Sequence, residues 1–262
     1  MTPGRSGVPP AAAAVASLGA ALFALPLVGL LWRVPWAGLG DALVAPEAIA
    51  AMRLSLVCSL AATALSVVLG LPLAWVQARG TFPGQALLRA LTLLPVVLPP
   101  VVSGVALLAV FGRHGLVGQW LEPLGIRLPF STAGAVLAET FVAMPFFVLS
   151  MEGALRGLDR RLEAAARSLG ATRWTVFGRV TMPLVRPAFG ASAALCWARA
   201  LGEFGATITF AGNFPGRTQT IPLAVYLALE SRPETGLALS LVLLVVSLAV
   251  LVMLRGRWLG RA

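Results

Sequence analysis

Three ionisable residues lie inside otherwise apolar stretches: Glu139, Arg199 and Glu203. A charge exposed to lipid costs about 3 kcal/mol or more, so we expect each of them to face protein or a water-filled cavity. Arg199 and Glu203 are four residues apart, a spacing that lets their side chains pair on one helix face. Two interpretations remain open: the pair locks helix packing, or it lines a conduit for an ion.

No residue set indicates catalysis, because the sequence has one histidine, His114, and no nucleophile–histidine–acid grouping. All 20 basic residues are arginine. A P-loop requires a lysine, so the sequence contains none. We therefore predict that the chain is not an enzyme and binds no cofactor. If ATP drives it, ATP and Mg²⁺ are expected on a separate ATPase chain.

The most polar stretch, residues 152–187, is rich in arginine and contains signals for two short helices. Gly170 predicts the end of the first helix, because glycine readily takes the left-handed backbone found there. Thr172 can cap the second helix, which Pro183 and Pro187 are expected to end. Small and apolar side chains recur along this stretch: Leu162, Ala164, Ala165, Ala166, Leu169, Ala171, Trp174 and Phe177. Glu163 directly precedes the run of alanines.

We call residues 158–182 the elbow and predict that it docks a soluble partner, since exposed apolar surface marks interaction sites. The alternative is a solvated cytoplasmic loop, whose arginines the positive-inside rule explains by itself. That rule does not explain Trp174 and Phe177 in a segment that faces water.

The remaining sequence is apolar enough to lie in a bilayer: 58% of the chain is hydrophobic and 11% charged, against about 25% charged in soluble domains. We predict an all-α polytopic membrane protein with about six transmembrane helices. Residues 1–48 would form the first helix and an outside loop, 49–254 the transmembrane domain with its cytoplasmic segment, and 255–262 a tail. The expected spans are 11–32, 49–76, 90–111, 131–151, 184–212 and 235–254.

The arginines are concentrated in the elbow and near the C-terminus, which places both termini in the cytoplasm. The net charge of +10 is thus explained by topology, and we expect no nucleic-acid partner. Pro99 and Pro100 fall within the third expected span. They mark either a passive kink or a bend that lines a pathway.

The elbow resembles the coupling motif of the type I ABC importer permeases, which reads Glu-Ala-Ala, three residues, Gly and a later Leu-Pro. Aligned on Gly170, the motif places Ala164 at the usual glutamate position, with Glu163 one residue early, and Met182 at the usual leucine. The resemblance implies the type I ABC importer permease fold. It also implies that an ATPase contacts Leu162, Glu163, Ala164, Ala165, Ala166, Leu169, Gly170, Ala171, Trp174, Phe177 and Pro183.

Residues 198–230 are similar to the molybdate branch of these permeases, through Gly-Glu-Phe-Gly-Ala-Thr at 202–207 and Pro-Gly-Arg-Thr-Gln-Thr at 215–220. The sulfate/thiosulfate permeases are close relatives. The resemblance implies a homodimeric permease for molybdate or tungstate in a bacterial or archaeal inner membrane, with two ATPase subunits and an extracytoplasmic molybdate-binding protein.

The alternatives are a sulfate/thiosulfate permease and, from another class, a secondary anion transporter. The candidates for the pathway and its gate are Pro99, Pro100, Arg199, Glu203, Phe204 and Thr207. The hydroxyls of residues 207–220 either bind an oxyanion or satisfy kinked backbone.

Overall fold

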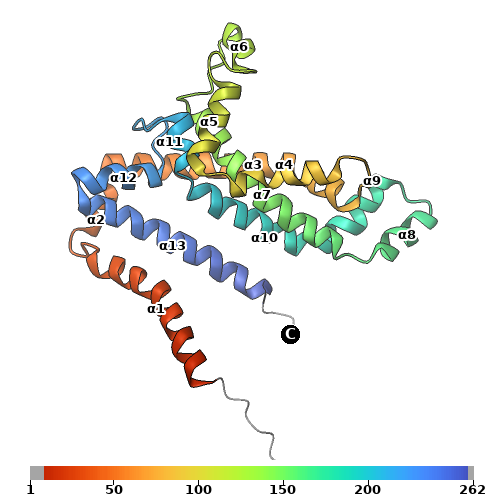
Figure 1. Ribbon diagram of the computed structural model, residues 1–262, viewed down its shortest axis with the longest axis horizontal. Coiled ribbons are helices and arrows are strands. Elements are labelled where there is room, and N and C mark those ends of the chain that lie inside the picture. The colour runs from red at the N-terminus through yellow and green to blue at the C-terminus, as the bar shows by residue number, and fades with distance from the viewer. Residues whose placement is uncertain (1–8, 259–262) are drawn as a thin grey trace, which may run out of the picture.

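The computed structural model describes residues 9–258, which are almost entirely helical and contain no β-strand (Figure 1). The helices in chain order are α1 (Pro10–Arg33), α2 (Leu39–Val44), α3 (Pro46–Arg79), α4 (Gln85–Val97), α5 (Pro100–Phe111), α6 (Gly118–Leu121), the 3₁₀ turn η1 (Glu122–Leu124), α7 (Thr132–Arg156), α8 (Arg160–Ser168), α9 (Arg173–Val176), the π-helical turn η2 (Phe177–Thr181), α10 (Met182–Leu201), α11 (Gly205–Ala211), α12 (Ile221–Ser231) and α13 (Pro233–Trp258).

Four helices of the described chain are long and apolar enough to cross a membrane: α1, α3, α7 and α13. They coincide with the first, second, fourth and sixth expected spans. Their burial differs: none of the most apolar window of α1 is buried, 17% of that of α13, 33% of that of α3 and 56% of that of α7, so all but α7 expose most of that window. Apolar side chains therefore cover the outside of the molecule, as a bilayer requires.

The third expected span is broken where Pro99 and Pro100 predict a bend, and the fifth, expected without a break, is also divided. Residues 90–111 divide between α4 and α5, and residues 184–212 between α10 and α11. The first break is explained by Pro99 and Pro100, which have no N–H and hold Leu98 in an extended conformation (φ −63°, ψ 137°). The second break spans residues 202–204. α5 turns away from α4 and, with α6, projects from the body (Figure 1).

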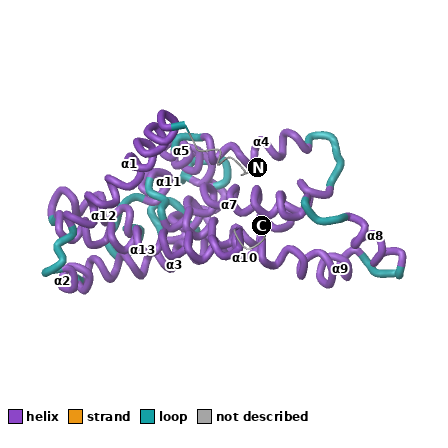
Figure 2. The backbone as a smooth tube through the Cα atoms, turned by 90° about the horizontal axis from the view of Figure 1, so that it is seen from below, coloured by secondary structure: helices purple, strands orange, loops and turns teal. Residues whose placement is uncertain are grey.

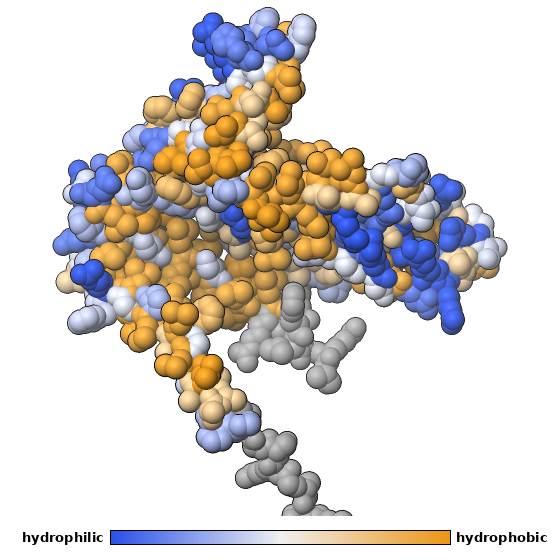
Figure 3. All heavy atoms as spheres, in the orientation of Figure 1, coloured by the Kyte–Doolittle hydropathy of each residue, from blue (hydrophilic) through white to orange (hydrophobic). Residues whose placement is uncertain are grey.

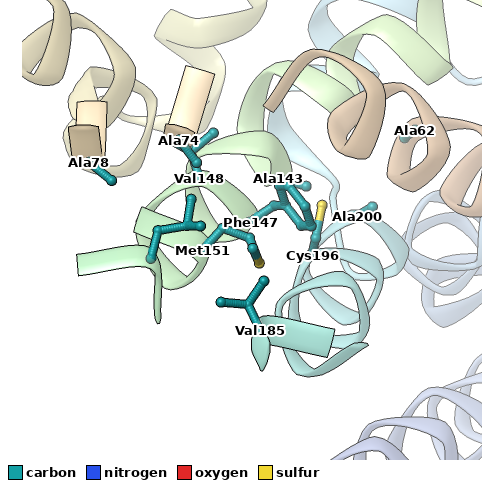
Figure 4. Packing of buried hydrophobic residues seen from close by; sticks show 11 residues of the cluster. Ala62, Ala74, Ala78, Ala143, Phe147, Val148, Met151, Val185, Cys196 and Ala200 are labelled. Carbon is teal, nitrogen blue, oxygen red and sulfur yellow. The ribbon is translucent and has the colours of Figure 1, made fainter. Parts of the chain in front are cut away.

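The core lies where α3, α7 and α10 run side by side. Phe147 and Met151 of α7 are fully buried among alanines of all three helices (Figure 4). A Cβ on Gly70 of α3 would lie 2.9 Å from the Cδ1 atom of Phe147. α3 and α7 therefore approach each other closely at a position where only glycine fits without a shift of its neighbours. Small residues permit such close approach between membrane helices.

The predicted outside stretch 213–232 contains a helix, α12, which packs on α13 and on α3. Ile221 and Ala224 of α12 join Leu239 of α13 in a small buried cluster. By contrast, α1 has no buried residue and stands apart from the bundle (Figure 1).

The elbow lies at one end of the long bundle, beyond the ends of α3 and α7 (Figures 1 and 2). Hydrophilic residues gather over α8 and α9 and at the tip that carries α6, while apolar residues cover the middle of the molecule (Figure 3). The elbow is therefore one of two polar extremities of an apolar body.

Candidate coupling site and pathway

The elbow has the helix–glycine–helix geometry that its sequence predicts. Gly170 takes the left-handed conformation, with φ of +87°. Its N–H donates to the carbonyl of Arg167 at 2.9 Å, and the next N–H donates to that of Ala166 at 3.1 Å, which together close a Schellman motif on α8. The hydroxyl of Thr172 accepts a hydrogen bond from the N–H of Thr175 and so caps α9.

Much of the elbow surface is apolar and exposed. Leu169 is 89% exposed, Trp174 75% and Leu162 48%. Ala164 and Ala165 are also exposed, and their short side chains leave the backbone of α8 accessible to a partner. Such a surface fits a docking role better than a solvated loop. That an ATPase contacts these residues stays a prediction.

Glu163 points toward the bundle and ties the elbow to it. Its Oε1 atom lies 2.9 Å from the Nη2 atom of Arg79 on α3 and accepts a hydrogen bond from the Thr181 hydroxyl at 3.0 Å. Only 15% of the Glu163 side chain and 14% of the Arg79 side chain are exposed. One carboxylate therefore joins α8, α3 and η2. No sequence pattern indicates Arg79 or Thr181 as its partners.

The two aromatic residues of the elbow differ in their contacts. Phe177 packs on Trp75 of α3, with ring centroids 4.7 Å apart. Trp174 touches the edge of this pair, 6.0 Å from Trp75, and presents most of its surface to solvent. Phe177 therefore anchors the elbow, and Trp174 remains available to a partner. Nothing in the sequence around Trp75 indicates its contact with Phe177.

The second elbow helix does not end at Pro183 and Pro187, contrary to prediction. α9 continues through η2 into α10, which contains both prolines. A proline ring inside an α-helix meets the carbonyl four residues earlier, and for Pro183 that carbonyl belongs to Arg179, in the wider π turn. The elbow is thus continuous with the helix that carries Arg199.

A second ion cluster lies beside the elbow and joins α7, α4 and α3. The Glu152 side chain is 3% exposed and contacts the guanidinium groups of both Arg89 and Arg156, the latter at 2.8 Å. Arg156 also donates to the backbone carbonyl of Gln77 at 3.1 Å. The helix ends nearest the elbow are therefore held together by charge.

The two helix breaks contact each other. A Cβ on Gly205, at the start of α11, would lie 2.5 Å from the Cβ of Pro100, and one on Gly104 would lie 2.5 Å from the Cβ of Thr209. Both glycines therefore allow α5 and α11 to approach closely. Pro99 directly precedes α5 and forms the other side of its break. Broken helices in membrane proteins occur where the backbone is buried in protein or lines a cavity.

Arg199 and Glu203 pair as predicted, at 2.7 Å between Nη1 and Oε2. The other carboxylate oxygen of Glu203 accepts the N–H of Ala206 at 2.9 Å. Glu203 is 2% exposed, whereas the Arg199 guanidinium reaches the surface over the ring of Phe146. The carboxylate thus satisfies backbone freed by the break, which supports the packing role of the pair. Its role in a conduit stays a prediction.

Phe204 and Thr207 flank the same break. The Phe204 ring packs against Tyr226 of α12, with centroids 5.4 Å apart. Thr207 is fully buried, and its hydroxyl has no hydrogen-bond partner within the described part of the chain. The same holds for Oε2 of Glu139, the third intramembrane charge. Water or a ligand would satisfy these atoms.

The other threonines near the break mainly serve the backbone. Thr209 donates to the carbonyl of Gly205 at 2.8 Å, and the Thr218 hydroxyl accepts the N–H of Phe214 at 2.9 Å. These contacts support the structural interpretation for Thr209 and Thr218, whereas the buried hydroxyls of Thr207 and Thr220 have no hydrogen-bond partner within the described residues.

Comparison with known proteins places this geometry in a family. Residues 70–262 match the model of the binding-protein-dependent transport system inner membrane component. The chain belongs to this family. Multi-pass membrane topology follows from the family and from the apolar helices, and the resemblance that the elbow carries is confirmed.

The curated relatives include permease proteins of molybdenum and of sulfate transport systems. The chain is 47% identical over 232 residues to the molybdenum transport system permease protein ModB of Mycobacterium tuberculosis, a match that covers 88% of each chain. It is 45% identical to ModB of Escherichia coli K12, covering 80% of this chain and 93% of that one. The sulfate transport system permease protein CysT of the same bacterium is 37% identical, covering 78% and 74%.

Solved structures confirm the predicted all-α importer fold. A bacterial ABC transporter involved in the import of alginate matches with a TM-score of 0.65 and 20% identity, over 88% of each chain. A second structure of an alginate transporter, in complex with a periplasmic protein bound to an alginate pentasaccharide, matches with a TM-score of 0.61 and 17% identity, over 92% and 95%. At these identities the likeness concerns the fold.

Proposed function

We propose that the chain is the membrane-spanning permease subunit of an ATP-driven molybdate importer. The observation that carries this proposal is the higher identity to two ModB permeases, 47% and 45%, than to a sulfate permease, 37%. Tungstate is a near-isostere of molybdate and is included in the proposal. Sulfate and thiosulfate are the alternative substrates, and a secondary transporter without an ATPase is disfavoured by the family.

The proposed machine contains two copies of the permease, two cytoplasmic ATPase subunits and an extracytoplasmic molybdate-binding protein. ATP and Mg²⁺ belong to the ATPases, since this sequence has no lysine with which to build a P-loop. The solved complex of a similar fold with a periplasmic protein supports the last partner. The elbow and both termini would face the cytoplasm, as the arginines favour.

The elbow provides the mechanical link between ATP and the pathway. Closure of the ATPases would pull two elbows together and switch the conduit from inward-facing to outward-facing. The displacement can reach the break at residues 202–204 because α9, η2 and α10 form one continuous helix. The permease supplies coupling and a gate, while selectivity rests largely on the binding protein.

The test is anion-dependent ATP hydrolysis and uptake in liposomes that contain the permease, its ATPase and its binding protein. We expect molybdate or tungstate on the binding protein to stimulate hydrolysis and to be taken up, with sulfate inactive. Stimulation by sulfate alone would keep the machine and overturn the substrate. Uptake in liposomes that lack the ATPase would overturn the whole proposal.

A further inference from the structure

A basic cavity of about 340 Å³ lies between the elbow and the end of α3. Four arginines line it, namely Arg79, Arg160, Arg167 and Arg173, against a single carboxylate, Glu163. We call it the arginine pocket. Trp75 and Phe177 form the apolar part of its wall. Its lining includes Glu163 and Phe177 but none of the most exposed apolar residues of the elbow, Leu162, Leu169 and Trp174.

The arginine pocket lacks negative charge. Glu163 is already bound to the Nη2 atom of Arg79 and to the Thr181 hydroxyl. The Nε and Nη1 atoms of Arg79 are buried and have no hydrogen-bond partner among residues 9–258. Arg160 and Arg173 form no ion pair within that range. Buried donors on a charged group are costly to leave unsatisfied, so the cavity is built for an anion with several acceptor oxygens.

We propose that the arginine pocket binds a phosphate group, supplied by the headgroup of an anionic phospholipid. Guanidinium groups match the tetrahedral oxygens of phosphate by paired hydrogen bonds. Basic pockets among membrane helices on the cytoplasmic side are suited to such headgroups. Trp75, Val176 and Phe177 line the cavity beside the arginines, so apolar surface that an acyl chain can contact adjoins the basic groups.

A bound headgroup would join three elements of the chain. Arg79 belongs to α3, Arg160 and Arg167 to α8, and Arg173 to α9. The lipid would therefore hold the elbow against the bundle, and its loss would loosen the elbow without altering the docking face. The proposal depends on the elbow lying at a membrane surface, and it does not depend on which anion is transported.

The test is thermal unfolding of the full chain in a zwitterionic detergent, titrated with short-chain phosphatidylglycerol, phosphatidylcholine of the same chain length, or inorganic phosphate at constant ionic strength. We expect phosphatidylglycerol to raise the unfolding temperature saturably and phosphatidylcholine to have no effect. In the variant Arg160→Gln/Arg173→Gln the half-saturating concentration of phosphatidylglycerol should rise about 100-fold. Each charged hydrogen-bonding group lost accounts for about a tenfold rise.

The matched control is Arg161→Gln/Arg179→Gln, which removes the same charge from the elbow outside the arginine pocket. This variant should respond to phosphatidylglycerol like the unaltered chain. An equal loss in both variants would reduce the effect to general attraction by the basic elbow and overturn the site, as would no response in the unaltered chain. If inorganic phosphate stabilises as well as the lipid, and only through Arg160 and Arg173, the lipid source is overturned in favour of the free anion.

Discussion

At the scale of residues, Gly170 sets the angle between α8 and α9. A Cβ on Gly170 would meet nothing within 4 Å, so a substitution there tests the backbone alone. At φ of +87° an L-residue costs about 1–2 kcal/mol. We expect Gly170→Ala to weaken binding of the ATPase to the permease in nanodiscs by about five- to thirtyfold. Titration of the nanodiscs with labelled ATPase measures the dissociation constant.

Gly178→Ala is the matched control, because Gly178 also has open space around it and no left-handed backbone. That variant should bind the ATPase normally. Equal affinities for the two variants would show that the angle at Gly170 does not govern docking.

The same scale shows what the sequence can indicate. Gly170 and Thr172 are predictable, because turn and cap chemistry depends on a few adjacent residues. The pairing of Arg199 with Glu203 is predictable for the same reason, since it spans one helical turn. The Glu163–Arg79 contact is not, because its partners are 84 residues apart and only tertiary packing brings them together.

At the scale of elements, the crossing of α5 and α11 depends on the absence of a side chain at Gly205. Gly205→Ala would place a methyl group 2.5 Å from the Cβ of Pro100, and overpacking of this kind costs about 1–3 kcal/mol. We expect a lower unfolding temperature and reduced molybdate uptake. Thermal unfolding of the purified chain and uptake in liposomes measure the two effects.

The control is Gly153→Ala on α7, where an added methyl group meets nothing within 4 Å. Helix propensity favours alanine there by about 1 kcal/mol, so this variant should be at least as stable as the unaltered chain. If Gly205→Ala is equally stable and active, the contact between the two breaks is not needed.

The breaks also mark the limit of prediction at this scale. Hydropathy locates the apolar stretches and is right for α1, α3, α7 and α13, where apolarity and helix coincide. The hydropathy of a stretch does not distinguish a straight helix from two helices that meet at an angle. Pro99 and Pro100 indicated a bend. At the second break Glu203 accepts the N–H of Ala206, a contact that composition does not reveal.

At the scale of the whole molecule, the elbow and the two breaks are separated by the α3–α7–α10 core, and coupling requires that core to move as one body. Phe147 is its largest fully buried side chain, in contact with Phe189 of α10 at 5.8 Å between ring centroids. Phe147→Ala should destabilise the permease by about 3–5 kcal/mol. We therefore expect the ATPase to bind but uptake per ATP hydrolysed to fall, as measured by parallel uptake and phosphate-release assays.

The control is Leu149→Ala, on the half-exposed face of α7, which should preserve both the stability of the permease and the ratio of uptake to ATP hydrolysed. An unchanged ratio in a Phe147→Ala protein of reduced stability would mean that coupling does not pass through this core.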